Sequence, residues 1–294
     1  MPLTIAPMPG GTGAIATGID IRQPLAPADR ERLHAALVEH IALCIRGQEL
    51  TPKQYIAAAR HFAEPMEQQF SEAFGHPDEP IVQIMTNHQR NTAGESYMHG
   101  LLWHTDHTHV AEPPNFTTLY AIEVPSQGGA TCIANMHKAY AALPEATRQR
   151  IDRIKVITVQ TQGKSSLTPS RKATILAVDE RIRFGAPHPL VRTHPVSGRK
   201  GLYFHPIKVE YLDGMTPDES RALLWDLLKQ TTRDDFVYRH RWQVGDFLIW
   251  DNRAALHQAD FDYDPAEHRV MWRMILKGER PFGPAMPREA AATA

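Results

Sequence analysis

The spacing of apolar residues predicts a short strand and two helices in the first 65 residues, and a third helix later in the chain. Leu33, Leu37 and Ile41 recur every four positions, which gives one helix an apolar stripe. Residues 51–54 read Thr-Pro-Lys-Gln, a capping box with proline in the first turn, so a second helix is expected to begin there. Residues 216–219 repeat that pattern ahead of two pairs of leucines and predict the third helix.

Short strand-like runs fill the space between and after these helices. Glycine and proline residues separate them, and they lie at 118–124, 153–160, 201–207, 236–240, 246–250 and 269–276. Strands that do not alternate regularly with helices favour antiparallel sheets over βαβ units. The sequence therefore predicts a mostly β fold, a sandwich or jelly roll with flanking helices packed outside.

One long stretch, residues 160–189, has little apolar patterning. It contains five basic residues, Lys164, Arg171, Lys172, Arg181 and Arg183. A segment of this length inside a compact domain is usually a lid or a mobile surface loop, and composition leaves both open. We expect residues 1–294 to form one domain that carries this stretch as a lid.

Composition excludes several classes of protein. The chain has 32 basic and 33 acidic residues, a balance that argues against a nucleic-acid or anionic-membrane partner. No apolar run reaches the roughly 18 residues of a transmembrane helix. The two cysteines, Cys44 and Cys132, are far apart in sequence, form no Cys-x-x-Cys motif and cannot make a disulfide framework. No signal peptide is visible, so we expect a cytoplasmic protein. We also expect a homo-oligomer, either a dimer or a tetramer.

The motif Trp-His-Thr-Asp at residues 103–106 is the first candidate for chemistry. On a strand, residues i and i+2 share a face, so His104 and Asp106 can bind one metal ion from one side of a sheet. A facial triad then needs a second histidine. His107 and His109 compete for this role, but a regular strand would turn both to the opposite face, at the surface or behind the ligands. Such His-x-Asp tripeptides also arise by chance. Two other histidines have no predicted place: His99 and His137.

His257 is the candidate for the second histidine. It follows an apolar strand and the polar turn Asp251-Asn252-Arg253. A lone histidine in apolar surroundings is more often a hydrogen-bonded core residue, so both interpretations stay open at this point.

The strand at 269–276 carries two arginines on one face. A period of two places Arg269, Met271, Arg273 and Ile275 together. A guanidinium on an interior face needs an anionic partner, and arginine suits a carboxylate or sulfonate. The two Cα atoms are expected to lie roughly 13 Å apart, which favours two separate anionic groups. The alternatives are pairing with internal carboxylates and exposure on an edge strand.

These motifs resemble the TauD/TfdA family of Fe(II)- and 2-oxoglutarate-dependent dioxygenases. The resemblance covers nearly the whole chain and includes the segments 18–22, 46–48, 103–106, 125–131, 191–200 and 250–253, then His257 and the two-arginine strand. It implies a double-stranded β-helix, a cupin-like jelly roll, which agrees with the strand pattern.

By this resemblance His104, Asp106 and His257 are the iron ligands. Arg269 binds the distal carboxylate of 2-oxoglutarate, and Thr131 donates a hydrogen bond to it. Three protein ligands leave positions for the 2-oxoacid and for O₂. The reaction implied is hydroxylation of a substrate with release of succinate and CO₂. Related halogenases lack the carboxylate, so Asp106 favours hydroxylation.

By the same resemblance, Arg273 binds the anionic group of the substrate. Three positions where specificity is set depart from the taurine enzymes: Gly100, His205 and Lys208. We therefore expect another small anion, namely a sulfonate, a sulfate ester, an aryloxyalkanoate or another carboxylate. The segment 236–246 resembles the aryloxyacetate enzymes but is expected to lie away from the site.

Two other functions are open to the same residues. A cupin-like protein could hold Zn²⁺ for hydrolysis with His104, Asp106 and His257, or the chain could be a non-catalytic metal-binding protein. Arg269, Thr131 and Arg273 argue against a hydrolase, which needs no binding group for a 2-oxoacid. A non-catalytic protein is disfavoured because all three ligand positions are present.

Overall fold

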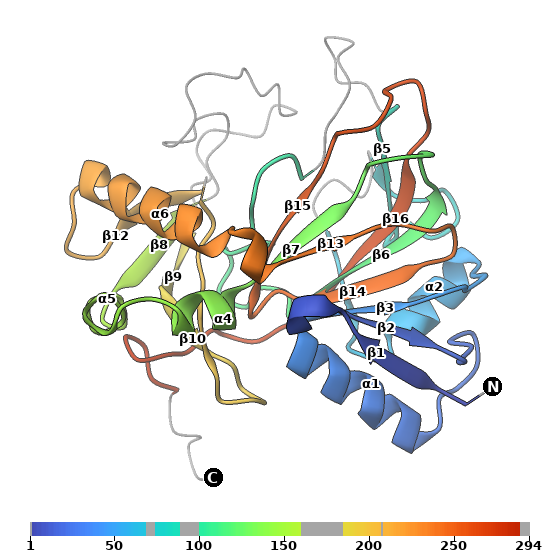
Figure 1. The fold of residues 1–294 in the computed structure, drawn as a ribbon, viewed down its shortest axis with the longest axis horizontal. Coiled ribbons are helices and arrows are strands. Elements are labelled where there is room, and N and C mark those ends of the chain that lie inside the picture. Colours follow the sequence, from blue (N-terminus) through green and yellow to red (C-terminus); the bar gives the residue numbers. More distant parts are fainter. Residues whose placement is uncertain (1, 69–73, 89–99, 160–184, 207, 289–294) are drawn as a thin grey trace.

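An eight-stranded mixed sheet forms the largest layer of the protein (Figure 1). The computed structural model describes residues 2–68, 74–88, 100–159, 185–206 and 208–288. The strand order is β1 (Thr4–Pro7), β2 (Ala14–Thr17), β3 (Ala42–Ile45), β14 (Phe247–Asp251), β6 (Phe116–Glu123), β16 (Val270–Leu276) and β4 (Pro65–Met66), with β5 (Gln83–Thr86) also paired to β16. Strands β2 and β3 are parallel, and the other pairs in this sheet are antiparallel.

A three-stranded antiparallel sheet packs against one face of the large sheet. Its order is β13 (Val237–His240), β7 (Thr131–Asn135) and β15 (Ala255–Ala259). Leu119, Leu248 and Met271 from the large sheet form a buried cluster with Ile133 and Tyr238 from the small one. Two facing sheets around an apolar layer are the architecture of a jelly roll. The predicted fold class is confirmed, although the sheets are mixed and not closed.

Helices α1 (Pro27–His40) and α2 (Pro52–Ala59) cover the opposite face of the large sheet (Figure 1). The residues of β14 alternate between the two faces of the large sheet. Phe247 and Ile249 pack in the apolar cluster that also contains residues of α1 and α2. Leu248 and Trp250 pack in the cluster between the sheets. A strand buried on both faces is apolar at every position, as this one is.

A third part of the fold lies at the other end of the molecule (Figure 1). It contains α4 (Met136–Ala141), α5 (Glu145–Ile151), α6 (Pro217–Thr231) and two small antiparallel sheets, β12 (Val209–Leu212)–β8 (Lys155–Val159)–β9 (Gly185–Pro189) and β10 (Val191–Thr193)–β11 (Lys200–Leu202). Short 3₁₀ helices occur at Pro9–Gly11 and Asp234–Phe236. A separate apolar cluster, which includes Leu190, Phe204 and Leu227, holds these elements together.

Both predicted capping boxes are confirmed, at Thr51 in α2 and at Thr216 in α6. The predicted place of Ile41 is wrong. Helix α1 ends at His40, and Ile41 adopts a left-handed φ of 69° as the chain turns into β3. Its side chain therefore packs between the sheets, not in the apolar stripe of α1.

The first 65 residues contain more strands than the apolar pattern predicts, since β1, β2, β3 and the start of β4 all lie there. Most of β1 is exposed, so it carries no apolar signal.

The segment expected to be a lid is only partly described. Residues 160–184 lie outside the described residues, and 185–189 form strand β9, which pairs with β8. The last five residues of the expected lid are therefore part of a sheet. Among the described residues, no helix combines the length and apolarity needed to cross a bilayer.

Candidate active site

The sheet pairing brings together the three predicted metal ligands. His257 lies in the middle of β15, and His104 forms an isolated bridge with it through backbone bonds of 2.9 and 2.8 Å. Their ring centroids are 4.1 Å apart. Asp106 follows two residues after His104, and one ligand atom from each of the three residues lies within 4.8 Å of the others.

The protonation of these groups suits a metal cation. Burial lowers the pKa of His104 and of His257, so both imidazoles are neutral at pH 7. Nδ1 of His104 lies 2.7 Å from the carbonyl oxygen of Leu102, and a carbonyl can only accept. This bond places the ring hydrogen on Nδ1 and leaves the lone pair on Nε2 for a ligand.

Asp106 supplies the negative charge. Burial by itself raises the pKa of this carboxyl, but the charge of the Arg273 guanidinium outweighs burial and holds the pKa well below its usual range. Two neutral imidazoles and one carboxylate are a donor set that fits a divalent transition metal such as iron.

The triad lines a cavity of about 330 Å³ between the two sheets. Every other residue predicted for the site also lines it: Gly100, Thr131, His205, Lys208, Arg269 and Arg273. The prediction that residues distant in sequence share one site is thus consistent with the structure.

Arg269 and Thr131 form one end of this cavity. The Arg269 side chain is buried, and its Nε donates to the carbonyl oxygen of Gly129 at 3.1 Å. Its Nη2 lies 3.4 Å from Thr131 Oγ1, to which Trp242 Nε1 also donates at 3.1 Å. No carboxylate among the described residues forms an ion pair with Arg269. Since a buried cation needs an anion, this end of the cavity suits a carboxylate ligand.

Arg273 lies on the same face of β16, as the period of two predicts, but close to the metal ligands. Its Nη2 lies 2.8 Å from Asp106 Oδ1. Its Nη1 donates to Gln68 Oε1 and, at 3.2 Å, to Gln83 Oε1. The two arginines therefore face different partners, and the internal pairing that the sequence left open is present at Arg273.

Three substrate candidates surround the triad. Gly100 has a φ of 74°, and a Cβ atom there would lie 3.5 Å from the His104 ring. The His205 ring centroid is 5.9 Å from that of His104. Burial lowers the pKa of Lys208, whose side chain also lines the cavity. Lys208 forms no ion pair with any carboxylate of the described residues.

The predicted orientation of His107 and His109 is wrong, although neither belongs to the group of three ligand atoms found among the described residues. His107 and His109 line the cavity, whereas a regular strand would have turned them away. The chain leaves the extended conformation after Asp106, and His107 adopts a φ of 49°. His99 lies outside the described residues. His137 is buried away from the cavity, with Nδ1 2.9 Å from the carbonyl oxygen of Lys200.

The segment 236–246 also contacts the site, contrary to prediction, because Trp242 donates to Thr131. Other polar residues that support the site were not predicted from the sequence. Gln68 and Gln83 contact Arg273, and Thr117 contacts Asp106. Glutamines and a strand threonine carry no distinctive motif, so no local signal identifies them.

A second cluster, Cys44, His240 and Asp246, also has the spacing of metal ligands. Its atoms are already paired with one another and with Arg46, which donates to Asp246 Oδ1 at 3.0 Å. Burial raises the pKa of the Cys44 thiol, which disfavours the thiolate that a metal needs. This cluster is a buried hydrogen-bond network that joins β3, the end of β13 and the residue before β14.

Comparison with known proteins agrees with this geometry. The chain is 32% identical over 286 residues to an alpha-ketoglutarate-dependent sulfate ester dioxygenase of Pseudomonas putida, across 96% of this chain and 91% of that protein. It is 31% identical over 281 residues to an (S)-phenoxypropionate/alpha-ketoglutarate-dioxygenase of Sphingobium herbicidovorans, across 94% and 95%.

Two crystal structures are similar over almost their whole length. A taurine dioxygenase from Burkholderia xenovorans has a TM-score of 0.77 and 31% identity, and the match covers 97% of this chain and 94% of that one. AAD-2, solved with Mn(II) and N-oxalylglycine, has a TM-score of 0.79 and 27% identity, with 96% and 99% covered.

The family described as taurine catabolism dioxygenase TauD, TfdA family, matches residues 4–275. A match of this extent confirms the resemblance seen in the sequence. The chain belongs to the TauD/TfdA family and is a dioxygenase that depends on Fe(II), 2-oxoglutarate and O₂.

Proposed function

We propose that this dioxygenase hydroxylates a small organic anion, with His104, Asp106 and His257 as its iron ligands. In this proposal Arg269 and Thr131 bind the distal carboxylate of 2-oxoglutarate. Arg273 and Lys208 bind the anionic group of the substrate, and Gly100 and His205 form the wall of the substrate pocket.

The observation that carries the proposal is the charge of the cavity. Among the described residues that line it, three have cationic side chains, Arg269, Arg273 and Lys208, and one has a carboxylate, Asp106. Arg269, the residue just before β16, lies four residues from Arg273 along an extended chain, far enough to serve the cosubstrate alone. Arg273 and Lys208 then remain beside the metal ligands, where they attract an anion and repel a cation.

The iron supplies the oxidising chemistry when it is bound, and the protein residues supply binding and orientation. Arg269 and Thr131 hold the cosubstrate at one end of the cavity, while Arg273 and Lys208 hold the substrate anion at the other. The apolar side chains of Phe74, Met85 and Leu119 line the same cavity and limit access of water.

The relatives suggest which anions to test. Two similar proteins are named for sulfate esters and for phenoxypropionate, both of which carry an anionic group next to an oxidisable carbon. Hydroxylation of a carbon bonded to a sulfate-ester or aryl-ether oxygen gives an unstable product that fragments. We therefore place sulfate esters, sulfonates and aryloxyalkanoates first among the candidates.

The decisive experiment measures succinate release from 2-oxoglutarate with Fe(II) across a panel of these anions and their uncharged analogues. We expect one class of anion to stimulate succinate release, and we expect Arg273→Gln and Lys208→Gln to raise the substrate KM more than the cosubstrate KM. Lys229→Gln, at an exposed position on α6, is the matched control. An uncharged compound that turns over better than every anion would overturn the proposal.

The alternatives of a zinc hydrolase and of a non-catalytic metal-binding protein are not retained, because the chain belongs to a family of dioxygenases. Single-domain organisation over 1–294, a cytoplasmic location and a homo-oligomeric state are further parts of the proposal. Analytical ultracentrifugation of the full chain tests the last of these.

A further inference from the structure

A chain of three hydrogen bonds leads from Trp250 to the Asp106 carboxylate. Trp250 Nε1 lies 3.1 Å from Asn252 Oδ1. Asn252 Nδ2 lies 2.8 Å from Thr117 Oγ1, and Thr117 Oγ1 lies 2.6 Å from Asp106 Oδ2. All four side chains are buried, so water does not compete for these bonds.

Only one direction of hydrogen bonding is possible along this chain. An indole N–H can only donate, so Asn252 accepts with Oδ1 and its amide Nδ2 faces Thr117. That nitrogen donates to Thr117 Oγ1, which leaves the hydroxyl hydrogen of Thr117 for Asp106. The ionised carboxylate can only accept, and 2.6 Å is a typical length for a hydroxyl that donates to a carboxylate.

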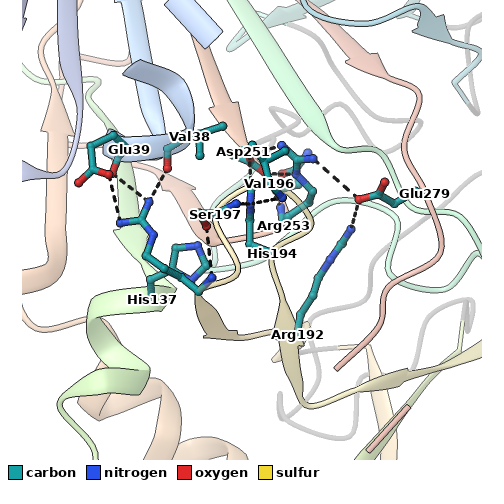
Figure 2. Close-up of polar contacts among 12 residues, drawn as sticks. Val38, Glu39, His137, Arg192, His194, Val196, Ser197, Asp251, Arg253 and Glu279 are labelled. Atoms are coloured by element: carbon teal, nitrogen blue, oxygen red, sulfur yellow. Dashed lines mark hydrogen bonds and ion pairs between the residues drawn. The ribbon is translucent and has the colours of Figure 1, made fainter. Parts of the chain in front are cut away.

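Polar contacts of Asp251 and Arg253, two buried side chains, hold the turn that carries Asn252 (Figure 2). Arg253 donates to both oxygens of Asp251, at 2.8 and 2.6 Å. His194 Nε2 lies 3.0 Å from Asp251 Oδ2, and Glu279 lies 3.8 Å from the Arg253 guanidinium. This network fixes the backbone between β14 and β15.

The backbone of Asn252 is bonded on both sides as well. Its N–H donates to the carbonyl oxygen of Asn115 at 2.9 Å. Its carbonyl oxygen accepts from Thr105 Oγ1 at 3.2 Å, and Thr105 lies between His104 and Asp106 in the chain. Asn252 therefore has little freedom to move away from Thr117.

We propose that Trp250, Asn252 and Thr117 form a one-directional hydrogen-bond relay that orients the Asp106 carboxylate for the metal. The proposal rests on the metal site of the proposed function and adds positioning residues to it. Thr117 and Asn252 act through Asp106 and touch no reacting atom. A carboxylate that is already oriented loses less freedom when the metal binds, so the relay raises metal affinity.

The test compares Mn(II) binding by variants without cosubstrate, followed by the EPR signal of the free ion. Mn(II) is the probe because it does not oxidise in air. Thr117→Val keeps the shape of the side chain and removes the donor, so we expect Mn(II) to bind on the order of 10- to 100-fold more weakly. Thr117→Ser restores the hydroxyl and is expected to restore most of the affinity.

The neighbouring residue offers a matched control. Thr118 is equally buried on β6, but its Oγ1 lies 2.8 Å from the Tyr55 hydroxyl, on the side of the sheet covered by helices. Thr118→Val removes a buried hydroxyl without touching the relay. We expect it to change thermal stability and leave the Mn(II) dissociation constant unchanged.

Two further variants test the direction of the relay. Asn252→Asp places an acceptor opposite Thr117, so the hydroxyl hydrogen turns away from Asp106 and Mn(II) binding weakens. Trp250→Phe is expected to weaken binding in the wild-type background and to have no further effect when combined with Thr117→Val, because both changes break the same chain.

Wild-type affinity in a folded Thr117→Val protein overturns the relay, and so do additive effects in the double variant. A different result overturns the metal site itself, and the relay with it. That result is a wild-type protein that binds no equivalent of Mn(II), or a His257→Ala variant that binds it as tightly as the wild type.

Discussion

Arg269 shows how one buried side chain defines one end of the cavity. Its guanidinium is bonded to a backbone carbonyl and to Thr131, and burial lowers its pKa. Among the described residues it forms no ion pair. A cation in this position is stable in the working enzyme only when an anion occupies the cavity beside it.

We therefore predict that Arg269→Ala raises the KM for 2-oxoglutarate far more than the KM for substrate. Loss of a buried charge-assisted bond costs on the order of 2–5 kcal/mol, which is a change of about 30-fold or more. Steady-state kinetics with each ligand varied in turn measures the two constants. Arg60→Ala, at an exposed position, is the control, and an unchanged cosubstrate KM would show that Arg269 is structural.

Trp242 sets the direction of a second hydrogen bond at this end of the cavity. Trp242 and Arg269 both donate to Thr131 Oγ1, so the hydroxyl hydrogen of Thr131 is free to point to a carboxylate. Trp242→Phe keeps the ring and removes one donor. We predict a cosubstrate Kd about 5-fold higher, equivalent to about 1 kcal/mol, measured by calorimetry on the Mn(II) protein. Trp225→Phe, on the exposed face of α6, should not change this Kd.

His257 is the residue on which the metal site depends most directly, because it pairs with both of the other ligands. We predict that His257→Ala abolishes substrate-dependent succinate release while circular dichroism shows an intact fold. Its backbone bonds to His104 do not involve the side chain and are retained. Full activity of this variant without added imidazole would contradict the assignment.

At the scale of elements, strand pairing decides how far apart in sequence the site residues can be. The period of two correctly places Arg269, just before β16, and Arg273, within it, on one interior side. Both line the cavity, whereas Met274 and Leu276 pack in the cluster that contains the helices. The same reasoning fails after Asp106. His107 takes a left-handed conformation, and no glycine or asparagine beside it indicates a turn. The sequence therefore gave no sign that the strand ends after Asp106.

The supporting polar residues could not be predicted for a different reason. Thr117 is a β-branched residue in a buried strand, and its sequence environment is the same whether or not it donates to a carboxylate. Thr117 lies beside Asp106 because of the register between β6 and β14 and the bridge between His104 and His257. The resemblance to a known family identifies the candidate metal ligands and cosubstrate residues. The residues that hydrogen-bond to them can be identified only from the three-dimensional structure.

A substitution at the N-terminus of helix α6 is expected to lower the stability of the protein without changing its activity. Thr216 accepts from the N–H of Glu219 and forms a capping box, while no residue of α6 lines the described cavity. We predict that Thr216→Ala lowers the free energy of unfolding by about 1 kcal/mol, measured by urea denaturation, with kcat unchanged. Glu219→Gln should cost less, because Gln54 fills the same role in α2. A large loss of activity in Thr216→Ala would contradict the separation.

At the scale of the whole molecule, the third part of the fold is bonded to the segment that carries the metal motif. His188 lies on β9, and its Nε2 lies 2.9 Å from the carbonyl oxygen of Val110. The carbonyl can only accept, so the neutral ring carries its hydrogen on Nε2. Burial lowers the pKa of His188 to about 4, although the bond to Val110 acts in the opposite direction.

Because of His188, we expect the stability of the fold to depend on pH. The unfolded chain binds a proton at His188 with a pKa near 6.5, whereas the folded protein does so only near pH 4. Stability is therefore complete above about pH 6.5 and falls as the pH drops toward 4, by up to about 1.4 kcal/mol per pH unit for this group. His188→Gln keeps an N–H donor but cannot titrate. We predict that urea denaturation of the metal-free variant shows lower stability at pH 7 but a smaller loss between pH 7 and 5 than the wild type. Parallel losses in the two proteins would show that His188 does not couple folding to pH.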